Sequence, residues 1–329
     1  MESNLFSRLL FFCLSLILIL PACTGSLQAE ADFFIRLNQV GFLPNDNKTA
    51  IVLSNRNLKD RKVEIKENRS KRTVLSLKID NSIGSYGRFK NSYIIDFTQL
   101  KENGEYIIIL EGRNSQPFNI RNNVYKGIAE SLLDFFKVQR CGYTDPFLHD
   151  ICHIADASSI IDGKRIINQP MDLTGGWHDA GDYVKFLNTT AFSTYMLLFA
   201  YDYDPIKFGF DLNKNNVPDV LEEAKIGLDW LLRCNYQNEK LVTQVQDLRD
   251  HDVGWRMPED DPLAFDRPAY LGIGKNIIGI YSAALALGSK IWKEKILYDE
   301  YAEKCLTTAE TFYKISNSAQ NVDSSGSGM

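Results

Sequence analysis

The most informative stretch of the sequence, residues 172–186, reads DLTGGWHDAGDYVKF. Its three glycines allow tight turns, because glycine adopts backbone conformations that other residues avoid. Asp179 and Asp182 lie three residues apart, so their carboxylates can converge on one point in a turn or in the first turn of a helix. Two convergent carboxylates can hold a water molecule and take its proton, one as the base and the other as the orienting group. A helix cap and a calcium loop are the alternative interpretations.

Upstream of this stretch, residues 33–120 have the pattern of a β domain. Short apolar runs at 33–37, 49–53, 62–65, 92–96 and 104–110 alternate with polar turns, for example at 44–47, 81–82 and 84–85. Strands at roughly 8–12-residue spacing over about 90 residues are typical of one immunoglobulin-like β-sandwich. The region has no cysteine and no tryptophan, which excludes an antibody-type domain.

From residue 125 onward, apolar residues recur at helical spacing. The pattern predicts helices at 125–140, 190–203, 218–235, 277–293 and 295–316. Two long loops, 141–189 and 236–275, separate some of them, and loops of this length in a compact domain are usually functional. The stretch at 172–186 lies inside the first loop.

That stretch closely resembles the signature of glycoside hydrolase family 9, the inverting cellulases with an (α/α)6 barrel, and we call it the signature segment. Further matching segments lie in the family's order on both sides. Residues 34–44 (FIRLNQVGFLP) resemble the start of the immunoglobulin-like domain that precedes some of these catalytic domains. Residues 136–142, 216–224 (NVPDVLEEA), 255–260 and 267–270 resemble segments of the barrel. The resemblance implies a multidomain β + α chain, with an immunoglobulin-like β-sandwich at 33–120 followed by an incomplete (α/α)6 barrel at 125–329.

The resemblance also implies an activity, the hydrolysis of β-1,4-glucosidic bonds in cellulose or related β-glucans with inversion. In that mechanism Asp182 is the general base and Asp179 positions the water. Inversion also needs a general acid, with the two carboxyl groups roughly 6.5–9.5 Å apart. The family's acid is a Glu near the end of the catalytic domain, and we find no match to its motif here; Glu303 and Glu310 fit an ordinary helical pattern.

Two residues of the second long loop are candidate substrate contacts by the same resemblance. The family has a DHxxWG-like segment there, and this chain has DHDVGW at 250–255, which contains His251 and Trp255 with one residue more before the Trp. Aromatic rings stack on the apolar faces of sugars. The alternative is that such an aromatic residue lies in the hydrophobic core, where aromatic residues are found more often than in a binding cleft. The expected partner is a β-glucan polysaccharide or oligosaccharide.

Four residues have the composition of a closed Cys₂His₂ zinc site: Cys141, Cys152, His153 and His178. Their spacing is not that of a zinc finger. The resemblance adds that some family members with an immunoglobulin-like domain carry such a site, whose last ligand precedes the catalytic Asp. Zinc would then hold the catalytic loop. Buried cysteines or a Cys141–Cys152 disulfide are the alternatives, and His149 is a further candidate ligand.

Residues 211–222 have the ligand spacing of an EF-hand-like calcium loop. The candidate calcium ligands are Asp211, Asn213, Asn215, Val217 through its carbonyl, Asp219 and Glu222. Asn216 replaces the usual glycine, which is tolerable because asparagine adopts the left-handed conformation. A polar loop followed by a capped helix is the alternative.

Residues 1–22 are typical of a signal peptide. The run at 9–20 is apolar apart from Ser15 and follows Arg8, whereas a spanning helix needs about 20 apolar residues. Cys23 follows Pro-Ala and resembles a bacterial lipoprotein box, so we expect lipidation at Cys23, with ordinary cleavage as the alternative. The chain is then exported and is a lipid-anchored bacterial surface or periplasmic protein, or else secreted. Its only membrane contact would be the anchor.

The composition of the 329 residues excludes other classes of protein. With 44% hydrophobic and 12% aromatic residues the chain is not disordered. Its net charge of −5 lacks the excess of positive charge with which proteins bind the phosphates of a nucleic acid. At a mean of about 12 residues per helix, the twelve helices of an (α/α)6 barrel do not fit into 125–329 once the two long loops are included. We therefore expect a chain truncated at its C-terminus. There are two rival functions. One is a non-catalytic or vestigial carbohydrate-binding surface protein, and the other is a structural surface module held together by a metal ion.

Overall fold

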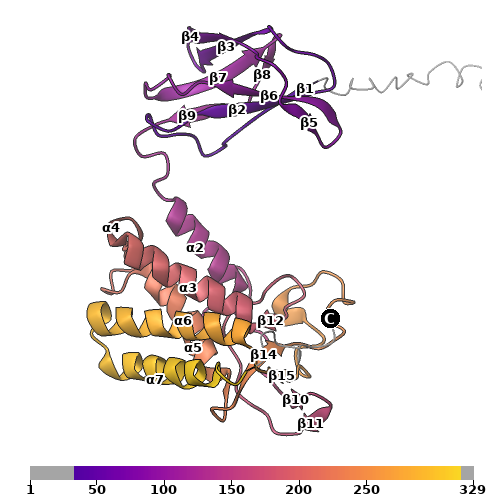
Figure 1. Cartoon of the computed structure of the whole chain (residues 1–329), viewed down its shortest axis with the longest axis vertical. Helices are drawn as coiled ribbons and strands as arrows, with labels where there is room; N and C mark the ends of the chain where they lie inside the picture. The colour runs from indigo at the N-terminus through magenta and orange to yellow at the C-terminus, as the bar shows by residue number, and fades with distance from the viewer. Residues whose placement is uncertain (1–32, 320–329) are drawn as a thin grey trace, which may run out of the picture. The chain divides into compact units, whose positions relative to one another are not determined.

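The computed structural model describes residues 33–319 (Figure 1). The predicted signal peptide and Cys23 lie outside these residues. The chain divides into two compact units, Met1–Lys126 and Gly127–Met329, and each has its own hydrophobic core. Within residues 33–319, no helix combines the length and apolar character that a membrane span requires.

The first unit is a sandwich of two antiparallel sheets. One sheet has the strand order β1-β2-β6-β5, formed by β1 (Phe33–Leu37), β2 (Thr49–Ser54), β5 (Gly84–Tyr86) and β6 (Phe89–Asp96). The other has the order β4-β3-β7-β8, and β9 also pairs with β7. Its strands are β3 (Lys62–Glu67), β4 (Thr73–Lys78), β7 (Gly104–Leu110), β8 (Arg113–Asn114) and β9 (Phe118–Ile120).

Alternating side chains build the core of this unit. In β3, Val63 and Ile65 are fully buried while the alternate residues are more exposed, as expected for a strand with one face in the core. Phe42, Phe97 and Phe118 pack against one another with ring centroids 5.3–5.9 Å apart. The predicted β-sandwich is confirmed. The turn predicted at 84–85 is wrong, because these residues form the short edge strand β5, whose side chains are all exposed and therefore show no apolar alternation.

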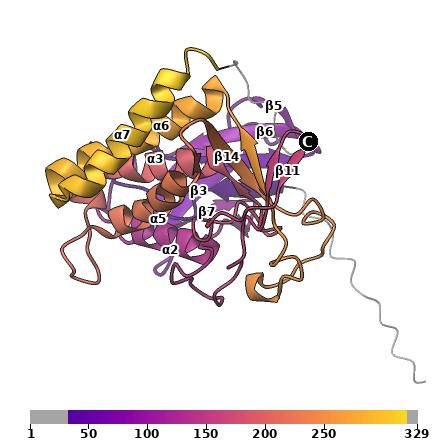
Figure 2. The same cartoon turned by 90° about the horizontal axis from the view of Figure 1, so that it is seen from below.

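The second unit is mainly helical (Figures 1 and 2). Its helices are α2 (Ile128–Gln139), α3 (Leu187–Tyr203), the single turn α4 (Pro205–Phe208), α5 (Asp219–Arg233), α6 (Lys275–Ile291) and α7 (Asp299–Ile315). Both views show α3, α6 and α7 side by side, and α5 packs against α3. The five predicted helices are present. The last begins later than expected because a π-helical turn (Trp292–Ile296) and the left-handed residue Leu297 precede it.

A six-stranded sheet, which the sequence did not predict, lies at one end of these helices (Figure 1). Its strands are β10 (Ile160–Asp162), β11 (Arg165–Ile167), β12 (Lys185–Phe186), β13 (Asn235–Tyr236), β14 (Lys240–Val245) and β15 (Ala269–Gly272). The order is β11-β10-β15-β14-β12, with β13 paired to β14. The two predicted loops thus become one sheet, and the pairing of β12 with β14 joins the end of the signature segment to the second loop.

The packing of α5 depends on a glycine. A Cβ atom at Gly227 would collide with Thr194 Oγ1 of α3 and lie 2.6 Å from the ring of Trp177. Gly227 therefore permits the close approach of α3 and of the signature segment to α5. By contrast, a Cβ at Gly279 of α6 would meet no atom within 4 Å.

We predict that Gly227→Ala lowers the free energy of unfolding by about 1–3 kcal/mol, because overpacking forces the side chains around it to shift. The matched control is Gly279→Ala, which should be neutral or stabilising by up to about 1 kcal/mol, since alanine is the better helix former. Urea unfolding followed by circular dichroism measures both. Equal midpoints for the two variants would contradict this account of the helix packing.

Candidate active site and metal centre

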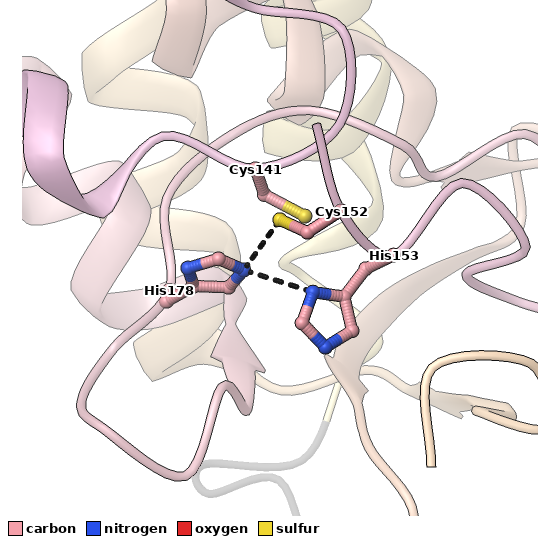
Figure 3. Close-up of side chains that lie close together, drawn as sticks. All are labelled: Cys141, Cys152, His153 and His178. Atoms are coloured by element: carbon pink, nitrogen blue, oxygen red, sulfur yellow. Dashed lines mark hydrogen bonds between the residues drawn. The ribbon is translucent and has the colours of Figure 1, made fainter. Parts of the chain in front are cut away.

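Four buried side chains meet beneath the signature segment: Cys141, Cys152, His153 and His178 (Figure 3). We call them the Cys/His cluster. Their ligand atoms all lie within 4.8 Å of one another. His178 Nε2 is 3.6 Å from Cys152 Sγ and 3.2 Å from His153 Nδ1. Both cysteines are free thiols, so the alternative disulfide is not formed. Two sulfurs and two imidazole nitrogens are a donor set that can hold a metal ion.

Backbone hydrogen bonds bring the ligands together from three segments. The N–H of His178 donates to the Gln139 carbonyl at the end of α2 (2.8 Å), and the N–H of Cys141 donates to Gly176 (3.0 Å). The N–H of Gly142 donates to the Cys152 carbonyl (3.1 Å). Gly142 has a φ of 71°, and a Cβ there would lie 2.7 Å from the backbone nitrogen of the neighbouring segment. A larger residue at 142 would therefore push the ligand segments apart.

A carboxylate fixes the orientation of His153. Nε2 of His153 lies 2.9 Å from Asp261 Oδ2. Because a carboxylate only accepts hydrogen bonds, Nε2 carries the proton and Nδ1 is left facing the cluster. This carboxylate–histidine arrangement is usual behind metal-binding histidines. Burial raises the pKa of Asp261, but its bonds to His153 and Arg256 outweigh that effect, so the carboxyl pKa is lowered and the group stays ionised.

A buried ionic network surrounds the cluster and consists of Asp156, Asp250, Asp261, Lys185, Arg256 and Arg267. Lys185 Nζ is 2.6 Å from Asp156 Oδ2. Arg267 contacts Asp156 (2.9 Å) and Asp250 (3.0 Å), and Arg256 contacts Asp261 (2.8 Å). Burial raises the pKa of Asp250 to about 6 although Arg267 opposes the rise. At neutral pH the three cations therefore balance three carboxylates.

The two thiols of the cluster have different proton affinities. Burial raises the pKa of Cys141, but the hydrogen bond with Cys152 and the charge of Lys185, whose Nζ is 3.5 Å away, outweigh it and leave the pKa well below its ordinary value. The pKa of Cys152 is raised by the bond to Cys141 and by burial. Lys185 therefore favours the thiolate form of Cys141 over that of Cys152.

The two candidate catalytic carboxylates stand on a short loop above the cluster. Asp179 is exposed, and the side chain of Asp182 is 27% exposed. His178 in the cluster anchors one end of the loop. Tyr183 anchors the other, because its ring packs on His178 and His153 with centroids 4.9 and 5.3 Å apart and its hydroxyl donates to the Arg256 carbonyl. Tyr183 has a φ of 64°, a strained conformation of the kind that clusters at functional sites.

The structure brings one predicted substrate contact to the predicted base. His251 Nδ1 lies 2.7 Å from Asp182 Oδ2, although 68 residues separate the two in the sequence. Trp255 is 84% exposed and so is not a core residue. Its contact with a sugar stays a prediction.

The cavity beside Asp179 is too small to enclose a sugar. It has about 90 Å³ and lies between α2, α3 and the signature segment, whereas ligand pockets usually have about 300–1,000 Å³. Asp179 itself is exposed and Asp182 is partly exposed.

The predicted calcium loop folds back onto the first turn of α5. The side-chain amides of Asn213 and Asn215 donate to Glu222, and Asp211 accepts hydrogen bonds from the N–H groups of residues 215 and 216. Asp219 accepts from the N–H of residue 212 instead. Lys214 and Asn216 have positive φ angles, as the tight loop requires. The loop thus brings most of the predicted ligands close together, and calcium binding stays a prediction.

The sequence did not predict the contacts that hold Trp177 beside the cluster. Trp177 Nε1 donates to Glu223 Oε1 (2.8 Å), and Arg140 contacts the same carboxylate through two nitrogens (2.6 and 3.2 Å). Glu223 is almost fully buried in α5. These bonds tie α2, α5 and the signature segment together. Glu223 belongs to the segment NVPDVLEEA that resembles the family, but nothing in the sequence indicated that its side chain is buried.

The comparisons with known proteins agree with this architecture. Residues 125–328 match glycosyl hydrolase family 9, and residues 31–115 match the cellulase N-terminal Ig-like domain. The chain thus combines an Ig-like β-sandwich with a helical domain of the glycosyl hydrolase type. The family match covers more than half of the sequence, so the chain belongs to glycoside hydrolase family 9.

Similar proteins are longer than this chain. Cellodextrinase of Butyrivibrio fibrisolvens is 28% identical in an alignment of 300 positions that covers 85% of this chain and 51% of that protein. Endoglucanase D of Acetivibrio thermocellus is 28% identical in an alignment of 316 positions that covers 91% of this chain and 48% of that protein. The crystal structure of a metagenome-derived family 9 endoglucanase superposes with a TM-score of 0.73 at 25% identity, over 88% of this chain and 55% of that one. The chain thus spans about half the length of the curated relatives it matches.

We predict that Glu223→Gln lowers the free energy of unfolding by about 1.5–3 kcal/mol, because it removes the charge from a buried hydrogen-bonded pair with Arg140. The matched control is Glu310→Gln, which breaks the exposed pair with Lys314 and should cost less than about 0.5 kcal/mol. Urea unfolding of both variants gives the comparison. A loss no larger than that of the control would show that the Glu223 contacts contribute nothing to stability.

Proposed function

We propose that this chain carries the general-base side of an active site that hydrolyses β-1,4-glucosidic bonds in cellulose or related β-glucans with inversion. The observation that carries the proposal is the position of Asp182, a half-buried carboxylate on a loop whose two ends are anchored, beside the second predicted aspartate. Membership of family 9 supports it, as do relatives named cellodextrinase and endoglucanase.

In the proposed mechanism, water attacks the anomeric carbon while Asp182 takes its proton and Asp179 orients it. An inverting site needs space for that water between the base and an acid roughly 6.5–9.5 Å away. No carboxyl group among residues 33–319 is assigned as the acid. The proposed activity therefore belongs to the whole protein that contains this chain.

We also propose that the Cys/His cluster binds Zn²⁺ as a structural ion. The surrounding network is already neutral, so the cluster itself must be nearly neutral to be stable in a buried position. Two thiolates, two neutral imidazoles and one divalent cation meet that condition, whereas a monovalent ion would leave a negative charge. When bound, zinc neutralises the thiolates and cross-links the segments that carry Cys141, Cys152 and His178.

Two further proposals concern calcium and location. We propose that residues 211–222 bind Ca²⁺, which the hydrogen-bonded loop before α5 supports. Export, with a lipid anchor at Cys23, rests on the sequence pattern alone.

We predict that Asp182→Asn lowers kcat/KM on barley β-glucan or carboxymethylcellulose by about 10²–10⁴-fold, because the attacking water loses its base. The assay measures reducing ends released by the protein that contains this chain, and proton NMR of the first product should show the α-anomer. The matched control is Asp252→Asn, an exposed carboxylate of the neighbouring loop, which should leave the rate unchanged.

Unchanged hydrolysis by Asp182→Asn would refute the base assignment. Binding of cello-oligosaccharides without any hydrolysis by the wild-type protein would favour the rival function, a carbohydrate-binding protein. The exposed Trp255 is the observation that favours this rival.

We predict that the purified protein holds about one zinc ion per chain and that Cys141→Ser abolishes this binding, whereas Cys234→Ala, a buried thiol outside the cluster, retains it. Because Cys152 has a raised pKa, zinc must displace its proton. For each proton that zinc displaces, the apparent affinity for zinc should therefore fall about tenfold when the pH is lowered by one unit. Elemental analysis and competition with a chromophoric chelator measure these effects, and a pH-independent affinity would contradict thiolate ligation.

A further inference from the structure

We propose that His251 is a positioning residue for Asp182: its imidazole holds one carboxylate oxygen, Oδ2, and so directs the other, Oδ1, to the attacking water. The sequence suggested a different role, in which His251 contacts the sugar. The proposal rests on the proposed role of Asp182 as the base, but the pairing itself can be tested without any hydrolysis.

The contact between the two side chains is short and isolated. The distance of 2.7 Å between Nδ1 and Oδ2 makes the two side chains an ion pair when the imidazole is protonated. Within residues 33–319, Asp182 has no other ion pair and no side-chain hydrogen bond. An Asp side chain at a half-exposed position rotates about two bonds, so His251 is the group in this part of the chain that restrains the carboxylate.

The backbones on both sides of this contact are fixed by one buried guanidinium. Nη1 of Arg267 lies 3.0–3.1 Å from both oxygens of Asp250, the residue before His251. Nη2 of Arg267 donates to the carbonyl of Tyr183, the residue after Asp182. Arg267 is fully buried, so a rigid interior sets the spacing of two side chains that meet at the surface.

The chemistry explains why such a restraint is useful. A general base must present a lone pair to the water in a defined direction, and small misplacements of reacting groups cost up to about 10²-fold in rate. The ring of His251 is 50% exposed, so the imidazole reaches the carboxylate from the solvent side without closing the surface above it. One oxygen is thereby held, and the other stays accessible.

The tautomer of His251 tests the pairing directly. The sequence contains only four histidines, so their ring nitrogens can be assigned by single substitutions. In long-range ¹H–¹⁵N spectra of the zinc-loaded protein, we expect His251 to carry its proton on Nδ1, and Asp182→Ala should abolish this preference. The matched control, Asp252→Ala, removes an adjacent exposed carboxylate and should leave the His251 signals unchanged. An Nε2–H tautomer in the wild-type protein, or signals unaffected by Asp182→Ala, would overturn the pairing.

Kinetics of the whole protein test the consequence for catalysis. His251→Phe, which removes the donor, should lower kcat by about 10–100-fold with little change in KM, since it misplaces the base and leaves sugar binding intact. His251→Asn keeps an N–H donor near the same place, so its kcat should be at least tenfold higher than that of His251→Phe. A raised KM at unchanged kcat would overturn the positioning role and make His251 a sugar contact. If the wild-type protein is inactive, the proposed function fails but the pairing of His251 with Asp182 does not, because the tautomer experiment tests that pairing without any hydrolysis.

Discussion

The buried guanidinium of Arg267 is the group on which the arrangement of the second unit depends. It neutralises Asp156 and Asp250 and donates to the Tyr183 carbonyl, so it joins the first loop, the second loop and the signature segment. Removing one partner of such a buried network is costly, because the remaining charges lose their compensation away from water. Lysine could not replace Arg267, since three separate nitrogens, Nε, Nη1 and Nη2, contact Asp156, Asp250 and the Tyr183 carbonyl, and lysine has only one nitrogen.

The interior and the surface of the site have different tasks. The cluster, the ionic network and Glu223 are buried, and they fix where residues 178 and 183 lie. Asp179 and Asp182, by contrast, lie at the surface with few protein partners, so water can reach them. The left-handed conformations of His153 and Tyr183 fit this division, because such strain persists only where surrounding contacts impose it.

Much of this could be predicted from the sequence, and the parts that could not share a physical cause. The helices and the sandwich were predictable because their apolar periodicity is local. The residues of the Cys/His cluster were predictable mainly from the family resemblance, because their spacing alone gave only a weak signal. The six-stranded sheet was missed because its strands have two to six residues and are mostly buried, which leaves no alternation to detect. The pairing of Asp182 with His251 and the charges around Arg267 were missed because they join residues far apart in sequence.

The unpaired state of Cys141 and Cys152 has a consequence for how the protein matures. Their sulfur atoms lie close together in the folded chain, so in an oxidising compartment a metal ion and an oxidant compete for the same two atoms. The ligands come from three segments and assemble only when the second unit folds, which makes the order of events decisive. If the proposed zinc ion binds first, the thiolates are protected. If oxidation comes first, a disulfide takes the place of the proposed metal cross-link and leaves His153 and His178 out of it.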